Sequence, residues 1–468
     1  MLTAGMLAGL GLFAFLIGAL TGIGGGFYAS IAVVLLLGSG FVVWNWRIGL
    51  WFCVLLLPFA ATYLIPRQML GIVGLNPMNA LLAATLGSLL LTALNPKNAV
   101  KLPPLPKVFL VYLAMIAGAA AYGSFYSSMA PIQTDATGSL VAMTKTKYLL
   151  DVLVKPMVIL VVAMLASMAV LDGKGRTIIF ALASSAFIFF CIVVGYLILT
   201  GTSLQVLASS RARGFLSWMG MHANELGLMS NMMFALLLFA ALRARRGLMR
   251  LLLFAAAIAA ALTALLTFSR GAFLGMAVIV AYYLISRRKL GQLFLGVIAV
   301  ALIVLLLPEA FIERATTGVA NRDIGAITAG RFDDIWRPLW PWVWDSPVWG
   351  HGLSSTLWAP AHLRGGMLPV GHPHNAYLGV LLDFGLLGVA VIAAFFLSMW
   401  RLFRNLKQNH SDPLWRGVFE GGSVCLLLLL VQGLTDDRFV PTYPQAALWL
   451  TYGLALGHAV ALSDARNI

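Results

Sequence analysis

The chain has 468 residues, of which 61% are hydrophobic and only 10% are charged. Soluble domains carry about 25% charged residues, so this composition excludes an ordinary soluble globular protein. The formal net charge is +15. No soluble basic domain is present to hold nucleic acid, so we attribute the basic excess to anionic membrane lipids and phosphate-bearing substrates. Cys53, Cys191 and Cys425 all lie within apolar runs, which excludes a disulfide framework and a cysteine-ligated metal.

Apolar runs of about 17–25 residues, each long enough to cross a bilayer as a helix, recur along the whole chain. The first run lacks the positively charged start of a cleavable signal peptide and is therefore interpreted as a span. We predict spans at residues 4–20, 27–43, 48–64, 79–94, 108–126, 150–171, 178–199, 225–242, 251–268, 271–286, 290–307, 376–400, 417–434 and 443–462. The sequence thus predicts an all-α polytopic membrane protein, a single integral membrane domain over residues 1–468. It has fourteen spans, or twelve if the first two runs do not cross.

The connectors between these spans give the orientation of the chain. An even number of spans places both termini on one side of the membrane, and 18 of the 31 Lys and Arg residues fall on that side. They lie within residues 97–107, 174–176, 243–250, 287–289 and 401–416, together with Arg47 and Arg466. Because short cytoplasmic loops carry an excess of Lys and Arg, this side is predicted to be cytoplasmic. The remaining polar connectors then face the opposite compartment.

One external connector is a very tight turn, Thr267-Phe268-Ser269-Arg270-Gly271. A turn this short between two apolar helices needs no charge, yet it presents Arg270. The glycine beside it permits close backbone approach, and a guanidinium binds phosphate oxygens in bidentate fashion. The alternative is a surface arginine that extends its charged tip to water without binding anything.

A second external connector, residues 200–224, carries Arg211 and Arg213 and ends at a helix start. Exposed backbone N–H groups at a helix start add affinity for anions, so this pair is a further candidate for phosphate binding. Alternatively, one of the two arginines is simply solvated. We interpret Asn224 and Glu225 as a helix cap and an acidic residue of the first helical turn.

The only long loop covers residues 308–371 and lies on the same external side. It holds six of the thirteen tryptophans, at positions 336, 340, 342, 344, 349 and 358. Residues 311–314 and 332–336 are predicted to form short helices on the membrane surface. Tryptophans at this density are typical of the lipid headgroup layer, with stacking against sugar faces as the alternative.

The loop ends in Gly371-His372-Pro373-His374-Asn375, immediately before the span at 376–400. Pro373 favours an extended residue before it and Asn375 is a good helix N-cap, so His374 is predicted at the helix start. A neutral imidazole at a membrane–water boundary suits a general base for a hydroxyl group. The alternative is an interfacial histidine that only caps and hydrogen-bonds. Further along, the small residues of Gly385-Leu386-Leu387-Gly388 allow close helix packing.

Templates for nucleotides and metals do not fit. No glycine-rich nucleotide loop with its lysine is present, which argues against ATP hydrolysis. His372 and His374 are one residue apart on a loop, which is not a metal-ligand spacing on a helix. The acidic pairs are Asp333/Asp334 and Asp436/Asp437. Exposed loop acids usually bind no ion, so we predict neither a metal nor a cofactor.

Together the motifs resemble a known family. His374-Asn375, nine residues, then Gly385-Leu386-Leu387-Gly388 resembles the signature of bacterial O-antigen ligases. Thr267-x-Ser269-Arg270-Gly271 resembles the core of the wider ligase and polymerase superfamily. Arg211-Ala212-Arg213-Gly214, followed by Asn224, is similar to its upstream arginine element. The likeness in order and spacing covers roughly residues 200–400.

The resemblance implies a GT-C-like bundle of twelve to fourteen helices in the inner membrane of a Gram-negative bacterium, with its active site facing the periplasm. It implies transfer of O-polysaccharide from undecaprenyl diphosphate to lipid A–core, without nucleotide or required metal. His374 matches the catalytic histidine, Arg270 the phosphate-binding arginine, and Arg211 or Arg213 the upstream arginine. His372, Asn375 and Asn224 are secondary candidates. Where superfamily members often carry Glu before Phe-Gly-Leu, this chain has Asp383, to which no catalytic role is assigned.

The mechanism predicted on this basis is a single inverting displacement, in which His374 accepts the proton of an acceptor hydroxyl while the arginines hold the diphosphate. Two rival functions remain. An O-antigen polymerase performs the same chemistry with a glycan acceptor, and Arg314 to Gly325 satisfies an Arg-x10-Gly spacing of such enzymes. A lipid-linked glycan flippase or channel performs no bond chemistry and predicts charges along a through-path. Here the conspicuous charges gather on one face.

Overall fold

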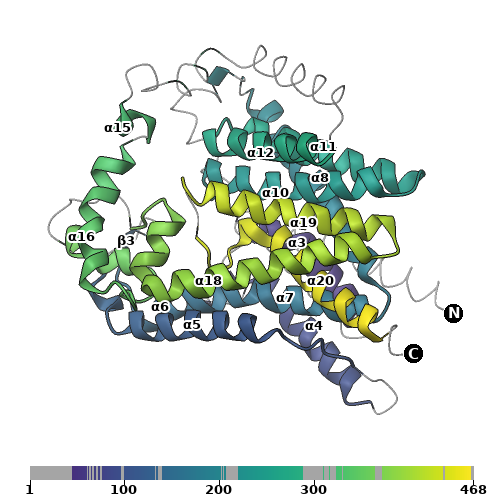
Figure 1. Ribbon diagram of the computed structural model, residues 1–468, viewed down its shortest axis with the longest axis horizontal. Coiled ribbons are helices and arrows are strands. Elements are labelled where there is room, and N and C mark those ends of the chain that lie inside the picture. The colour runs from purple at the N-terminus through teal and green to yellow at the C-terminus, as the bar shows by residue number, and fades with distance from the viewer. Residues whose placement is uncertain are drawn as a thin grey trace, which may run out of the picture.

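The computed structural model describes residues 45–60, 62, 65, 68–69, 72–73, 76–95, 100–131, 133–134, 140–201, 203, 205–206, 220–287, 309, 312, 316, 323–328, 330–363, 371–435 and 438–464. These residues form a bundle of long helices (Figure 1). Three predicted spans, 4–20, 27–43 and 290–307, lie outside the described residues, and so does the arginine pair at 211 and 213.

The helices of the bundle follow one another along most of the described chain. They are α3 (Trp46–Leu56), α4 (Pro77–Ala93), α5 (Lys107–Ser124), α6 (Lys145–Leu149), α7 (Lys155–Leu171), α8 (Gly175–Thr200), α10 (Ala223–Arg243), α11 (Leu248–Leu266), α12 (Arg270–Arg287), α18 (Ala376–Asn409), α19 (Pro413–Gln432) and α20 (Ala446–Asp464). A π-helical turn, η3 (Leu150–Val154), joins α6 to α7, and the 3-10 helices are η1 (Leu57–Phe59), η2 (Ser127–Met129) and η7 (Tyr443–Gln445).

The connectors hold short elements. Between α12 and α18 lie α15 (Ile324–Ile327), the π-helix η5 (Phe332–Trp336), α16 (Arg337–Asp345), the 3-10 helix η6 (Ser355–Trp358) and α17 (Pro360–Leu363). Two antiparallel hairpins pair β1 (Gln68–Met69) with β2 (Ile72–Val73) and β3 (Gln133–Thr134) with β4 (Leu140–Val141). These hairpins are only two residues deep and leave the bundle all-α in character.

The predicted spans correspond to helices wherever the chain is described. In the described part of the chain, eight helices are long and apolar enough to cross a membrane: 107–124, 145–171, 175–200, 223–243, 248–266, 376–409, 413–432 and 443–463. Three shorter apolar helices, 46–59, 77–93 and 270–286, coincide with further predicted spans. The fold class is therefore confirmed as an all-α multi-pass membrane protein.

Helix α10 lies at the centre of the bundle, beside α19 (Figure 1). Two glycines of α19 make this contact close. A methyl group at Gly417 would lie 2.3 Å from the carbonyl oxygen of Phe239, and one at Gly421 would lie 2.7 Å from the Cα atom of Leu236. Small residues four positions apart let helix backbones approach in this way. The pair aligns the external end of α10 with the end of α19.

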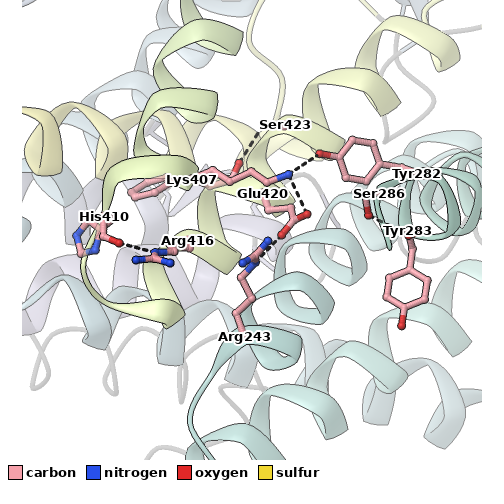
Figure 2. A network of polar contacts seen from close by, with 10 residues as sticks. Arg243, Tyr282, Tyr283, Ser286, Lys407, His410, Arg416, Glu420 and Ser423 are labelled. Atoms are coloured by element: carbon pink, nitrogen blue, oxygen red, sulfur yellow. Dashed lines mark hydrogen bonds and ion pairs between the residues drawn. The ribbon is translucent and has the colours of Figure 1, made fainter. Parts of the chain in front are cut away.

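A buried carboxylate joins four helices at the opposite end of the bundle (Figure 2). Glu420 of α19 is 1% exposed. It accepts a hydrogen bond of 2.6 Å from Arg243 Nε and pairs with Lys407 Nζ at 2.9 Å. Lys407 also donates to the Tyr282 hydroxyl of α12 at 3.3 Å. Because an unpaired charge in a membrane-embedded core is costly, these partners fix the ends of α10, α12 and α18 around Glu420.

Two further ion pairs lie at helix ends of the same side. Arg47 pairs with Asp172 at 2.5 Å, and Arg176 pairs with Asp412 at 2.7 Å. Burial opposes ionisation of Asp412, yet the Arg176 guanidinium and the Leu414 N–H hold its pKa below its usual value. The basic residues that the sequence assigns to the cytoplasmic side therefore gather where α10 and α18 end and α19 begins.

Helix α18 differs from its prediction in length. The sequence predicted a span over 376–400 followed by a basic connector, whereas the helix continues to Asn409 and carries Arg401, Arg404 and Lys407. Phe403 and Leu406 explain the difference, because both are buried in the core at helical spacing. The connector to α19 is reduced to residues 410–412.

Helix α18 is also broken at Gly385, whose φ of 64° and ψ of −162° are not helical. The chain before η6 enters this break: Leu386 N donates to Pro347 O at 2.8 Å, and His351 N donates to Leu382 O at 2.8 Å. A methyl group at Gly385 would lie 2.3 Å from the Val348 carbonyl carbon. The glycine was predicted to permit helix packing, but instead it admits a loop backbone.

The long external loop contains more helix than predicted. Residues 332–336 are helical as expected, but the helix continues through α16 to Asp345, and of residues 311–314 only Ile312 is described. Leu339 and Val343 explain the extension, because they pack with Leu378 and Leu382 of α18 in a small separate core. Helix α16 lies beside the first part of α18 at one end of the bundle (Figure 1).

Candidate functional site

A polar cavity of about 320 Å³ lies at the ends of the bundle helices that the sequence predicts to be external. Its wall comes from four places: the start of α10, the chain from Ser354 into η6, the start of α18 with the residues just before it, and the end of α19 with the chain that follows it. The polar and charged residues of this wall are Asn224, Glu225, Ser354, Thr356, His372, His374, Asn375, Asp383, Gln432, Arg438 and Thr442. The cavity therefore lies at the opposite end of the bundle from Glu420 and its cations.

The start of α18 is fixed by its N-cap. Asn375 Oδ1 accepts hydrogen bonds from Tyr377 N at 3.0 Å and Leu378 N at 3.1 Å. The backbone N–H of Ala376, which precedes these two, donates to Gly433 O at the end of α19 at 2.7 Å. The predicted cap at Asn375 is thus confirmed. It holds the preceding histidines beside the end of α19.

His372 and His374 both line the cavity, with ring centroids 3.9 Å apart. His374 has a φ of 49°, a left-handed conformation that is strained for a residue with a side chain. The contacts on either side of it maintain this conformation: Trp336 Nε1 donates to Pro373 O at 2.8 Å, and Asn375 caps α18. Strained backbone held in this way is common at functional sites, because it fixes the direction of a side chain.

The N-cap of α10 is not the residue predicted. His222 caps the helix, since its Nδ1 accepts from Asn224 N at 3.3 Å. Glu225 completes a capping box by accepting from His222 N at 3.0 Å, so its assignment to the first turn is confirmed. Histidine caps helices rarely, which is why the sequence favoured Asn224. Asn224 instead accepts a hydrogen bond of 2.5 Å from Ser269 Oγ.

The predicted tight turn is confirmed, with α11 ending at Leu266 and α12 beginning at Arg270. Phe268 in this turn has a φ of 44°. Gly271 O accepts a hydrogen bond of 2.9 Å from Gln432 Nε2. Through Ser269 and Gly271, the turn contacts two cavity residues, Asn224 and Gln432. Arg270 is half-buried and begins α12 between these two contacts, although its own side chain is not part of the described cavity wall.

Two loop histidines lie away from the cavity wall. His351 stacks on Trp342 with ring centroids 3.7 Å apart, and its Nε2 lies 2.7 Å from Trp342 O. Burial lowers the pKa of His351, and it also lowers the pKa of His362. Both imidazoles are therefore neutral near pH 7 and take part in the packing of the loop.

Sequence reasoning gave no role to several residues of the wall, among them Asp383, Gln432 and Arg438. Gln432 lies within the apolar run 417–434, and Arg438 lies in the short polar connector that follows it, so nothing beyond their polarity marked them. Asp383 was noted as a departure from the family pattern, yet its carboxylate organises the loop. It accepts from Ser354 N at 3.0 Å, and from Ser355 N and Oγ at 2.9 Å each.

No group of three His, Cys, Asp or Glu residues gathers as a metal site in the described ranges. Asp436, Asp437 and Arg314 lie outside these ranges. The predicted roles of Arg211, Arg213 and the acidic pair 436/437 therefore stay predictions, and so does independence from metal.

Residues 255–393 match the protein family described as O-antigen ligase. This match supports membership of the chain in the O-antigen ligase superfamily. The match begins within α11 and ends within α18, so it includes the turn at Arg270, the histidine segment and the break at Gly385. The match supports an activity of the O-antigen ligase/polymerase type in general. No curated protein is significantly similar to the chain in sequence.

Proposed function

We propose that the protein is an O-antigen ligase of the bacterial inner membrane. It transfers O-polysaccharide from undecaprenyl diphosphate to a hydroxyl of lipid A–core on the periplasmic side, with inversion at the anomeric carbon. The observation that carries this proposal is the position of His374. It lines a polar cavity at the external helix ends, on strained backbone, within the segment that matches the family.

In this proposal His374 accepts the proton of the acceptor hydroxyl, whose oxygen attacks the anomeric carbon. The bond from that carbon to the diphosphate oxygen breaks, and the lipid diphosphate leaves with both electrons. Arg270, with Arg211 or Arg213, stabilises the negative charge that grows on this leaving group. His372, Asn375 and Asn224 orient the reacting groups. Binding both lipids at one cavity supplies much of the rate enhancement through proximity.

One assay distinguishes this function from its rivals. Purified protein receives glycan-linked undecaprenyl diphosphate together with either lipid A–core or a second lipid-linked glycan. A ligase transfers the glycan to lipid A–core, whereas a polymerase lengthens the second glycan. A flippase or channel produces no new glycosidic bond with either acceptor, and that result would refute the proposal.

The reaction is expected to proceed without a divalent metal. In the described part of the chain the acidic residues form no cluster of three, and the leaving charge is assigned to arginine. Treatment with EDTA should leave the transfer rate within about twofold of that of the untreated enzyme. The arginines, and not a metal ion, stabilise the leaving diphosphate in this proposal, so removal of divalent ions should not slow the reaction. The measurement is the initial rate with and without chelator. Complete loss that Mg²⁺ or Mn²⁺ restores would contradict the prediction.

An apolar groove of about 550 Å³ lies beside the cavity, between α18 and α19. Val380 and Phe439 belong to both walls. The groove follows α18 from Leu386 to Trp400, which is about 20 Å at about 1.5 Å per residue. One leaflet of the hydrocarbon core is about 15 Å thick. A groove of this length and shape supports a single long isoprenoid chain, as the proposed donor carries, rather than the several acyl chains of lipid A.

A bulky residue in this groove should weaken the binding of donors that carry long isoprenoid chains. Ala393 lines the groove and Ala394 does not, although both are exposed and adjacent on α18. We expect Ala393→Trp to raise the KM for a full-length donor about tenfold, since burying isoprenoid carbons contributes about 25 cal/mol per Å². A donor with a two-isoprene tail, too short to reach Ala393, should be unaffected. The KM for both donors is measured for each variant, and equal effects of Ala393→Trp and Ala394→Trp would contradict the assignment.

A further inference from the structure

Arg438 is the cation of the cavity wall that lies outside the family match and outside the sequence motifs. It follows α19 and lines the same cavity as His372 and His374. Its side chain is exposed, while its neighbours Phe439 and Val440 are buried. The residue therefore presents a long charged side chain to the cavity from a segment that is anchored in the protein.

Buried side chains from two helices hold this segment. Arg438 O accepts a hydrogen bond of 2.7 Å from Gln445 Nε2, and Gln445 is fully buried with its Oε1 accepting from Trp449 Nε1 at 2.9 Å. Phe439 O accepts from the buried Tyr112 hydroxyl at 2.7 Å. Hydrogen bonds between buried groups are costly to break, so the backbone beneath the guanidinium is rigid.

The guanidinium itself is only lightly engaged. Its Nη1 donates to Ser354 Oγ at 3.3 Å, which is long for a hydrogen bond to a charged donor. Among the described residues, no carboxylate lies within ion-pair distance of it. An arginine has five N–H donors, and a rigid cavity arginine that uses one of them weakly retains a fork of donors for a ligand.

The nearby buried carboxylate of Asp383 makes its hydrogen bonds to other residues and forms no ion pair with Arg438. Asp383 accepts three hydrogen bonds from Ser354 and Ser355. These bonds hold Ser354 at a φ of 63°, a left-handed conformation that is strained for serine. Ser354 thereby directs its hydroxyl toward Arg438. Asp383 and Ser354 act as positioning residues beneath the guanidinium.

We propose that Arg438 binds a phosphate group of a substrate in this cavity, across from the histidines. The inference rests on the proposed function. A planar guanidinium matches two phosphate oxygens in a bidentate contact, which lysine cannot reproduce. The phosphate belongs either to the diphosphate of the donor or to a phosphorylated sugar of the acceptor. Both sources share the chemistry that Arg438 recognises.

Steady-state kinetics test the proposal with Arg438→Met, Arg438→Lys and the control Arg337→Met, which removes an exposed arginine on α16 outside the cavity wall. Arg438→Met should raise the KM for the phosphate-bearing substrate about ten- to hundredfold, as expected for a charge-assisted hydrogen bond. Arg438→Lys should recover part of the loss. A rise for the donor alone assigns the phosphate to the donor. A rise for phosphorylated but not dephosphorylated acceptor assigns it to the acceptor.

A binding measurement separates this proposal from the proposed function. Undecaprenyl diphosphate without a glycan should raise the Tm of the wild-type protein and of Arg337→Met in lipid nanodiscs, and a donor-side role predicts no rise for Arg438→Met. If wild-type protein transfers no glycan but the Tm rise still depends on Arg438, the anion site stands and the proposed function fails. The proposal is overturned if Arg438→Met and Arg337→Met show the same kinetic constants and the same rise in Tm.

Discussion

His374→Ala is expected to reduce glycan transfer about 10²- to 10⁴-fold, the range that a general base contributes. The variant removes the imidazole from the cavity wall. Its residual rate would come from substrate proximity and from stabilisation of the leaving diphosphate, which do not need the imidazole. The substitution also removes no contact from the bundle core, since His374 is only half-buried, so the protein should stay folded. The measurement is kcat with saturating donor and acceptor.

The matched control is His372→Ala, because both histidines line the cavity and their ring centroids lie 3.9 Å apart. We expect a smaller loss, since the second ring can only help to orient the first. Both proteins should elute from size exclusion like the wild type and show the same Tm. If His374→Ala keeps near-normal turnover while His372→Ala does not, the base has been assigned to the wrong histidine.

Local features were predictable where a few adjacent residues determine them. The cap at Asn375 needs only an amide side chain before a helix, and the turn at 267–271 needs only a small group of residues between two apolar runs. Hydropathy located every described span, because each helix must bury its backbone hydrogen bonds in lipid. These signals require no knowledge of partners distant in sequence.

Features that depend on distant partners were not predictable. The break at Gly385 exists because residues 347–352, about 35 positions earlier in the chain, donate to and accept from the backbone groups that the break exposes. Arg243, Lys407 and Glu420 read as separate charges until the fold places them together. Arg438 lies 64 positions after His374, and no local motif connects the two. Their common cavity is a product of tertiary packing.

Substitution of Arg270 decides between the two interpretations that the sequence leaves open for this residue, phosphate binding and simple solvation. If the guanidinium holds the donor diphosphate, Arg270→Lys should lose about tenfold in transfer rate, because lysine keeps the charge but not the planar fork. Arg270→Ala should lose about 10²- to 10³-fold, the loss that follows removal of one donor to a developing oxyanion. If Arg270 only extends to water, lysine serves equally well, since a long stem and a positive tip suffice.

The test is the transfer rate of both variants, normalised to folded protein, with short-chain and long-chain glycan donors. The loss should be the same for both donors, because the diphosphate is common to every chain length. Arg250→Ala is the control, since Arg250 lies at the opposite end of α11 from the turn, with its guanidinium 5.5 Å from the Phe254 ring centroid. Wild-type rates for both Arg270 variants would exclude Arg270 from the site. The diphosphate would then be held by Arg211, Arg213 and Arg438. In that case the Tm rise caused by undecaprenyl diphosphate should depend more strongly on Arg438, and the binding measurement on Arg438→Met would detect this.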